Sequence, residues 1–191
     1  MIIGITGGSG CGKTTLLKLI AEKGGLILDC DAIYHELLTS DKAMLSAIEA
    51  RFPGVVEEEQ LNRKKLGAIV FTDERALLDL NAITHAAVKK EVLRRLENSP
   101  FLAAIDAIAL FEGGLAELCD VTVAVTAPSE DRVRRLMQRD HISEEYARAR
   151  ISAQHEDAWF REKCGHVLEN NGSLDAFATK CVDFLHSLDI M

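Results

Sequence analysis

A glycine-rich segment near the N-terminus constrains the fold of this 191-residue chain more than any other part of the sequence. Residues 7–14 read Gly-Gly-Ser-Gly-Cys-Gly-Lys-Thr, which fits the phosphate-binding pattern GxxxxGK[ST], the P-loop. Its glycines allow the backbone to curl so that successive N–H groups point at phosphate oxygens. Such a loop lies between a buried strand and the start of a helix, so the segment predicts an α/β fold.

The residues around the P-loop supply the elements that the motif needs. Residues 1–6 are rich in isoleucine and predict a buried strand, and residues 14–23 have the apolar spacing of a helix. Residues 26–28 predict a second strand. Further strands are expected over 101–105, 121–125 and 167–168, and a closing helix over 174–188. The order of strand, loop, helix and strand is typical of a parallel sheet flanked by helices.

The P-loop predicts a nucleotide site. Lys13 would bridge the β- and γ-phosphates, and the Thr14 hydroxyl would bind Mg²⁺. A glycine-rich turn with a surface lysine is the alternative, and the flanking strand and helix argue against it. The nucleotide-binding residues predicted from the motif are Gly8, Gly10, Cys11, Gly12, Lys13, Thr14 and Thr15.

Two carboxylates follow the second strand. Ligands bind at the carboxyl ends of the strands in such sheets, so we expect Asp29 and Asp31 to lie beside the P-loop. One carboxylate could accept a proton from an attacking hydroxyl while the other supports Mg²⁺. Locally, Asp31 is equally compatible with a role as the N-cap of the next helix.

Two helical regions are expected to enclose the substrates. Residues 32–97 read as an almost uninterrupted helical insert on the substrate side, in which Pro53-Gly54 is the one clear turn and His85 is the best functional candidate. Residues 129–163 predict a lid with helices over 129–140 and 143–163. Seven of the twelve arginines fall between 132 and 161, and kinases use lid arginines to neutralise the transferred phosphoryl group. Ordinary surface ion pairs are the alternative. Trp159 and Phe160 are interpreted as packing residues.

Composition excludes several classes of protein. The net charge of −8 argues against a protein that coats nucleic acid. Apolar runs are too short for a membrane span, and no signal peptide is expected. The five cysteines form no CxxC pair, which disfavours a zinc site or a disulfide framework and favours the reducing cytoplasm. We expect a monomer or a weak homo-oligomer without nucleic-acid or membrane partners.

The sequence resembles the dephospho-coenzyme A kinase family over nearly its whole length. The matching segments are Ile3–Thr15, Leu28–His35, Leu61–Leu66, Ile69–Phe71, Leu80–His85, Leu110–Glu112 and Val167–Gly172, together with Arg139, Asp140, Arg150, Ile151 and Gln154 of the lid and the following helix. This resemblance implies one P-loop kinase domain over residues 1–191, with a central parallel sheet, a helical substrate-binding insert and a helical lid. It also implies transfer of the γ-phosphoryl of ATP, with Mg²⁺, to the ribose 3′-hydroxyl of dephospho-coenzyme A.

The resemblance also assigns residue roles. Asp31 matches the general base, Lys13 and Thr14 match the phosphate and magnesium contacts, and Arg139 matches the lid arginine. Three further residues are implied to bind substrates, on the acceptor side or near the adenine: His85, Glu112 and Asn170. Asp106 and Glu112 flank the end of the strand expected over 101–105, where they could be outer ligands of magnesium or substrate, or merely polar residues at a strand end.

Three positions depart from the family pattern. Ala86 stands where the family has Pro, Ile108-Ala109 where it has Pro-Leu, and Cys164-Gly165 where it has Ala-Asp. None of these changes removes the P-loop, Asp31 or Arg139. The alternatives are a nucleoside or nucleotide kinase with another acceptor, and a nucleotide-binding switch without transfer activity. The sequence lacks the Asn-Lys-x-Asp segment of a guanine-reading switch.

Overall fold

A five-stranded parallel sheet forms the centre of the computed structural model, which describes residues 1–97 and 101–190. Its spatial order is β2-β5-β1-β6-β7, and every neighbouring pair is parallel. This confirms the predicted sheet. The strands are β1 (Ile2–Thr6), β2 (Leu26–Asp29), β5 (Ala103–Asp106), β6 (Val121–Thr126) and β7 (His166–Glu169).

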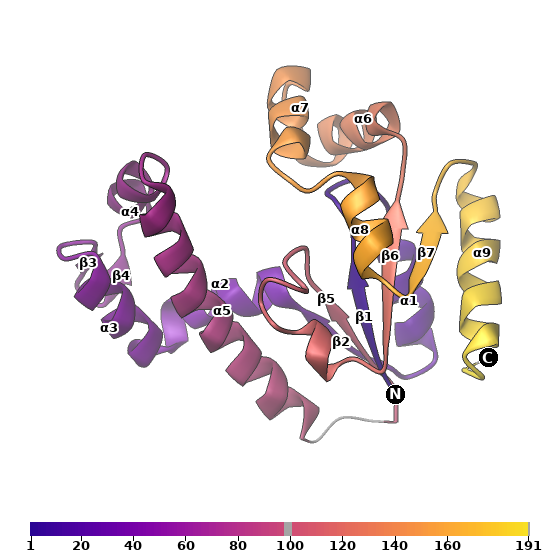
Figure 1. Cartoon of the computed structure of the whole chain (residues 1–191), viewed down its shortest axis with the longest axis horizontal. Helices are drawn as coiled ribbons and strands as arrows, with labels where there is room; N and C mark the ends of the chain where they lie inside the picture. The colour runs from indigo at the N-terminus through magenta and orange to yellow at the C-terminus, as the bar shows by residue number, and fades with distance from the viewer. Residues whose placement is uncertain (98–100, 191) are drawn as a thin grey trace.

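One face of the sheet is covered by α1 (Lys13–Glu22) and α9 (Leu174–Ser187), which lie side by side in Figure 1. Ile3 and Ile5 of β1 are fully buried against this pair, in one cluster with Leu16 and Phe177. β-Branched residues suit a strand that is buried on both faces. The apolar strand β1 therefore lies at the centre of the sheet, and the P-loop follows at the carboxyl end of this strand.

The helical insert lies to one side of the sheet and is formed by α2 (Cys30–Ser40), α3 (Lys42–Arg51), α4 (Arg63–Val70) and α5 (Glu74–Leu96) (Figure 1). The prediction of helices interrupted only by the turn at Pro53-Gly54 was wrong in one place. A short hairpin, β3 (Val56–Glu57) and β4 (Gln60–Leu61), separates α3 from α4. Its turn residues, Glu58 and Glu59, have positive φ angles of 49° and 62°. Glutamate carries no sequence signal for that backbone conformation.

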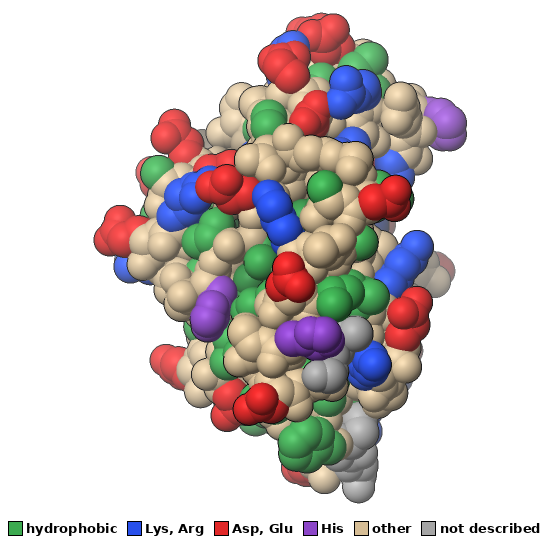
Figure 2. Space-filling view, turned by 90° about the vertical axis from the view of Figure 1, so that its right-hand side faces the viewer, with side chains coloured by type: hydrophobic (Ala, Val, Ile, Leu, Met, Phe, Trp, Pro, Cys, Tyr) green, Lys and Arg blue, Asp and Glu red, His purple; other side chains and the backbone are tan. Residues whose placement is uncertain are grey.

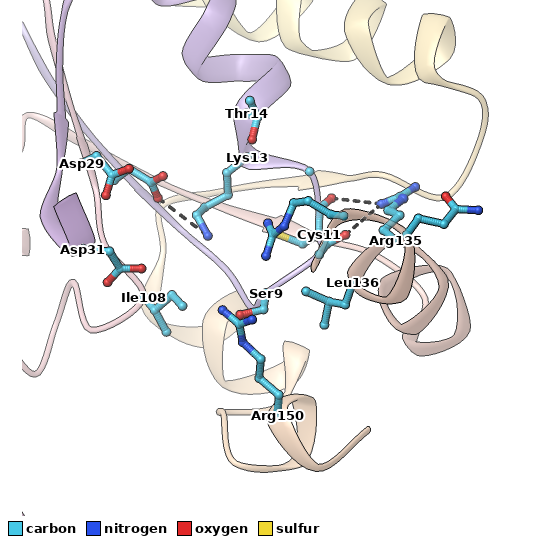
Figure 3. Close-up of a pocket in the computed structure, with 15 residues that line it drawn as sticks. Ser9, Cys11, Lys13, Thr14, Asp29, Asp31, Ile108, Arg135, Leu136 and Arg150 are labelled. Carbon is cyan, nitrogen blue, oxygen red and sulfur yellow. Dashed lines mark hydrogen bonds and ion pairs between the residues drawn. The ribbon is translucent and has the colours of Figure 1, made fainter. Parts of the chain in front are cut away.

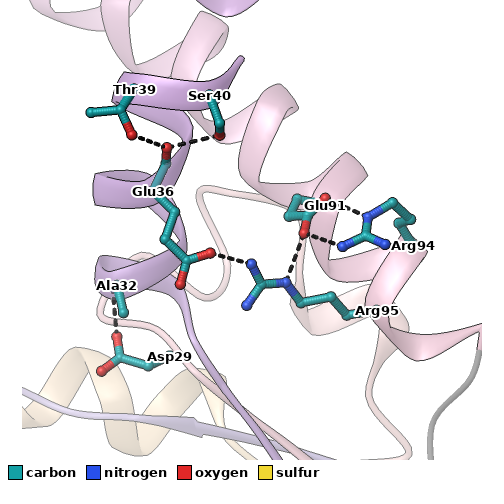
Figure 4. A network of polar contacts seen from close by, with 8 residues as sticks. All are labelled: Asp29, Ala32, Glu36, Thr39, Ser40, Glu91, Arg94 and Arg95. Carbon is teal, nitrogen blue, oxygen red and sulfur yellow. Dashed lines mark hydrogen bonds and ion pairs between the residues drawn. The ribbon is translucent and has the colours of Figure 1, made fainter.

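Polar contacts join α2 to α5 within the insert (Figure 4). Arg95 donates to Glu91 on its own helix at 2.7 Å and also to Glu36 of α2. Arg94 donates twice to the same Glu91. Exposed pairs of this kind contribute little individually, but the network links α5 to the helix that carries Asp31.

The lid region consists of α6 (Ser129–Asp140), α7 (Glu144–Ser152) and α8 (Asp157–Lys163), and a 3₁₀ turn, η1 (Ala116–Leu118), precedes β6. The prediction of one helix over 143–163 was wrong, because residues 153–156 separate α7 from α8. The side chains of Gln154 and His155 in this break bind other parts of the chain. Tertiary contacts therefore replace helical ones where local propensity favours a continuous helix.

Candidate active site

A cavity of about 560 Å³ opens at the carboxyl ends of the strands (Figure 3). The P-loop forms one wall, the acidic strand ends form a second, and helices α6 and α7 form a third. Its lining residues are Ser9, Gly10, Cys11, Gly12, Lys13, Thr14, Asp29, Asp31, Asp106, Ile108, Arg135, Leu136, Gln138, Arg139 and Arg150. The structure therefore brings together most of the residues that the motif predicts; Gly8 and Thr15 lie outside this lining.

Lys13 projects across the cavity toward the acidic wall (Figure 3). Its Nζ donates to the carbonyl oxygen of Gly7 at 3.0 Å and lies 3.7 Å from Asp106 Oδ1. Gly12, the N-cap of α1, has a φ of 103°, so glycine suits this turn. The N-terminus of α1 faces the cavity, where its partial positive charge favours an anion.

Asn170 and Arg135 support the P-loop through its carbonyl oxygens. Asn170 Nδ2 donates to Cys11 O at 2.9 Å, and Arg135 donates to Gly10 O at 3.2 Å. Asn170 is buried and lies outside the cavity lining. A Cβ on Gly12 would lie 2.4 Å from Asn170 Nδ2, so the two residues are in close contact. The structure thus places Asn170 against the P-loop itself.

Asp29 and Asp31 both line the cavity but differ in their contacts. Asp29 is the N-cap of α2 and accepts from the Ala32 N–H at 3.0 Å. The alternative in which Asp31 caps this helix is therefore wrong. Asp31 lies in the first turn, and its carboxylate faces the cavity (Figure 3). That carboxylate is available to a substrate.

Asp106 is a third acid of this wall, at the end of β5. It pairs in register with Asp29 of β2. Burial above all raises the pKa of Asp106 to about 6; the neighbouring Asp29 and Asp31 contribute to this rise, and Lys13 opposes it. The sequence leaves Asp106 two interpretations, an outer ligand of magnesium or substrate and a polar residue at a strand end. Its burial beside the P-loop lysine makes it part of the site.

A second cavity of about 260 Å³ adjoins the first on the side of the insert. Asp31 and Ile108 line both cavities. His85 of α5 lines the second cavity together with Tyr34, whose phenol pKa is raised by burial. Most of the remaining wall is apolar. Two binding spaces thus meet at one carboxylate.

Arg139, the predicted lid arginine, lines the first cavity from α6. It donates to both carboxylate oxygens of Asp140, at 2.6 and 2.9 Å, and Arg150 of α7 donates to the same residue at 2.8 Å. These hydrogen bonds, that from Arg139 above all, lower the pKa of Asp140 to about 2. Asp140 thereby holds two arginines that line the first cavity.

Other arginines of the lid region belong to ordinary surface pairs. Arg134 pairs with Asp131, and Arg148 pairs with Glu130 and Glu144. Figure 2 shows acidic and basic side chains mixed over one face of the molecule rather than separated by sign. For these arginines the alternative of ordinary surface ion pairs therefore holds. Of the arginines in the lid region, Arg135, Arg139 and Arg150 line the first cavity.

Glu112 lies outside the lining of both cavities. Its Oε1 is 2.6 Å from His155 Nε2, and the His155 ring stacks on Trp159 at a centroid distance of 3.9 Å. Phe160 is fully buried beside them, in line with a packing role. In this structure Glu112 contacts the lid region rather than either cavity.

The three departures from the family pattern are accommodated locally. Ala86 lies within the continuous helix α5, where alanine keeps the backbone hydrogen bond that proline would lose. Ile108 and Ala109 line the second cavity, and the Gly165 N–H donates to Thr122 Oγ1 at 3.0 Å. These positions change cavity walls and element ends without disturbing the P-loop.

The donor set suits a hard divalent cation. Thr14 and the three carboxylates present oxygen atoms, the ligands that Mg²⁺ prefers. Within residues 1–97 and 101–190, no group of three or more His, Cys, Asp or Glu side chains is placed to hold a metal. No helix in the described part of the chain is long and apolar enough to cross a membrane.

The chain is similar to one kind of enzyme over most of its length. The dephospho-CoA kinase family model matches residues 1–176. A dephospho-CoA kinase of Moorella thermoacetica is 36% identical over 182 residues, covering 92% of this chain and 86% of that protein. The crystal structure of TT1252 from Thermus thermophilus has a TM-score of 0.81 at 34% identity, covering 98% and 97% of the two chains. A dephospho-CoA kinase from Campylobacter jejuni has a TM-score of 0.66 at 26% identity, covering 98% and 96%.

Proposed function

This chain belongs to the dephospho-CoA kinase family, the ATP-dependent kinases of the final step of coenzyme A biosynthesis, and from that premise we propose how its residues perform the transfer. The 560 Å³ cavity takes the triphosphate of ATP, and the 260 Å³ cavity takes part of dephospho-CoA. The observation that carries this proposal is the position of Asp31, which lines both cavities. A group that serves both substrates must stand between them.

In the proposed mechanism Asp31 orients the ribose 3′-hydroxyl and accepts its proton. The hydroxyl oxygen attacks the γ-phosphorus as the bond to the leaving oxygen of ADP breaks, and the developing charge falls on the phosphoryl oxygens. Lys13 moves from its contacts with Gly7 and Asp106 to the phosphates. Arg139 and Arg150 supply further positive charge from the lid.

Mg²⁺ would be held at the Thr14 hydroxyl, with the carboxylates nearby available to its water ligands. When bound, it neutralises charge on the phosphates. His85 is proposed to contact the acceptor in the second cavity. The cysteines are all free in the part of the chain that the structure describes, which supports a reducing compartment such as the cytoplasm.

The test is ADP release from Mg-ATP with and without dephospho-CoA, with mass detection of the product. We expect ADP formation that depends on the acceptor and a product one phosphoryl group heavier. Acceptor-independent hydrolysis would favour a switch, and transfer only to a nucleoside or nucleotide panel would favour another kinase. The family match does not favour either alternative.

A further inference from the structure

The connector between α7 and α8, residues 153–156, contacts the P-loop directly. The Ser9 N–H donates to Gln154 Oε1 at 2.9 Å, and Gln154 Nε2 donates to Ser9 Oγ at 2.8 Å. One side chain thus binds both the main chain and the side chain of a residue that lines the nucleotide cavity. The contact spans 145 positions in the sequence.

Arg132 of α6 binds both Ser9 and Gln154, so hydrogen bonds connect all three residues to one another. Arg132 Nε donates to Ser9 O at 3.0 Å, and its NH2 group donates to Gln154 Oε1 at 3.1 Å. Arg132 is only 4% exposed. A Cβ at Gly8 would lie 2.0 Å from Arg132 NH2 and 3.0 Å from Gln154 Oε1. The glycine at position 8 is therefore required by the close approach of these two side chains.

The connector is also fixed by the residue that follows Gln154. His155 pairs with Glu112 at 2.6 Å and stacks almost parallel on Trp159 of α8. Gln154 thus extends toward the P-loop from a segment that is held independently of the P-loop. At the other end, α7 places Arg150 in the nucleotide cavity.

We propose that Gln154 is a positioning residue of the ATP site, which anchors the P-loop at Ser9 so that the N–H groups that follow Ser9 face the phosphates, and which fixes the lid at the P-loop. The inference rests on the proposed function only in taking the larger cavity as the ATP site. A P-loop binds through several N–H groups that must point at one place. Ordering them before ATP arrives removes an entropic penalty from binding.

The test is direct calorimetric titration of Mg-ATP, without acceptor, into wild type and Gln154→Met. Methionine keeps the length of the side chain but has neither amide donor nor amide acceptor. We expect the Kd for ATP to rise about tenfold, the usual range for a lost buried hydrogen-bond partner. The KM for the acceptor should stay within about twofold, because the second cavity is untouched.

A double-mutant cycle separates positioning from general damage. Ser9→Ala removes only the hydroxyl partner, so we expect a rise in Kd of roughly threefold. The double variant should bind ATP no more weakly than Gln154→Met alone, since both changes act on one contact. Fully additive effects would contradict the proposal.

Ser152→Ala is the matched control. It removes a hydrogen bond from Ser152 Oγ to Arg148 O, 2.9 Å long, at the same end of α7, and leaves the P-loop contacts intact. Its Kd for ATP should equal that of wild type. An unchanged Kd in Gln154→Met, or an equal change in acceptor KM, would overturn the inference. A wild type that fails to bind ATP would instead contradict the proposed function.

Discussion

Asp29 and Asp31 are two residues apart, carry the same side chain and line the same cavity, yet their backbone positions give them different tasks. Asp29 ends β2 and uses its carboxylate on the first turn of α2. Asp31 lies inside that turn, at the junction of the two cavities. The helix N-terminus favours negative charge at both positions.

Asp31→Asn should lower kcat by about 10²–10⁴-fold, the usual contribution of a general base. The Kd for ATP should change little, because asparagine keeps the shape and the P-loop is untouched. Coupled detection of ADP release gives kcat, and titration gives the Kd. Asp29→Asn is the control: asparagine is an equally good N-cap, so α2 stays intact and the loss should be far smaller. Near-normal turnover of Asp31→Asn would show that the base assignment is wrong.

Asp106 should make stability depend on pH. The folded state raises the pKa of Asp106 from 3.8 to about 6, so its protonated form favours folding. This contribution is complete below about pH 4 and is lost as pH rises through 6. Asp106→Asn removes the dependence. Its free energy of unfolding relative to wild type should therefore rise by up to about 3 kcal/mol between pH 4 and pH 8. Urea titrations at several pH values measure this, and a pH-independent difference would contradict it.

The residues around the P-loop show which contacts can be predicted from local sequence and which cannot. Lys13 and Thr14 are predictable because their roles depend on spacing within eight residues. Arg132, Arg135 and Gln154 were not predicted as P-loop contacts, since they meet Gly10 and Ser9 only after the sheet brings α6 and the connector over β1. A buried arginine on an amphipathic helix gives no sequence signal of its partner. The sequence left Asp106 open as an outer magnesium or substrate ligand or as a polar strand end, and its burial beside Lys13 was not predictable.

At the level of elements, the arginines of helix α6 lie on two different faces of the helix. Positions 132, 135 and 139 follow helical spacing and meet the P-loop or the cavity, while Arg134 faces outward. Asp140 then ties Arg139 of α6 to Arg150 of α7. The cavity-facing arginines of the two helices are thus linked as one unit. The sequence pattern of either helix alone does not distinguish these arginines from arginines in surface ion pairs.

Arg139→Ala should lower kcat by about 10²–10³-fold, the loss typical of a group that stabilises transition-state charge. Arg139→Lys should not restore the rate, because an ammonium cannot reproduce the planar fork that binds two oxygens. Steady-state kinetics with both substrates saturating measures the effect. Arg134→Ala is the matched control on the same helix, and its kcat should be that of wild type. Equal losses in the two variants would argue against a catalytic lid arginine.

Two elements escaped prediction for the same physical reason. The break at 153–156 exists because Gln154 and His155 bind Ser9 and Glu112, which lie far away in sequence. The β3–β4 hairpin turns at Glu58 and Glu59, and Lys65 of α4 pairs with Glu57 at its edge. Periodicity finds helices and strands, but it does not detect an interruption stabilised from outside the segment.

Across the whole molecule, the sheet is joined differently to the insert and to the lid. One apolar cluster runs from Leu28 and Ile105 of the sheet to Val92 of α5, so the insert shares the main core. Helices α6 and α7 have a small cluster of their own, built on Val133, Leu136 and Ala147. Polar contacts such as those of Gln154 and Arg135 link that unit to the P-loop. Little apolar surface must separate for the lid to move.

The lid should therefore be the least stable unit of the free protein and should become ordered by its ligands. In hydrogen exchange followed by mass spectrometry, α6 and α7 should exchange faster than β1 and α1, because few buried apolar contacts protect them. Mg-ATP at 100 times its Kd should slow that exchange by up to about 100-fold. Lys13→Ala, which removes the P-loop cation, should show much less protection at the same concentrations. Protection of α6 and α7 equal to that of β1 in the free protein would contradict a mobile lid, as would exchange that ligands leave unchanged.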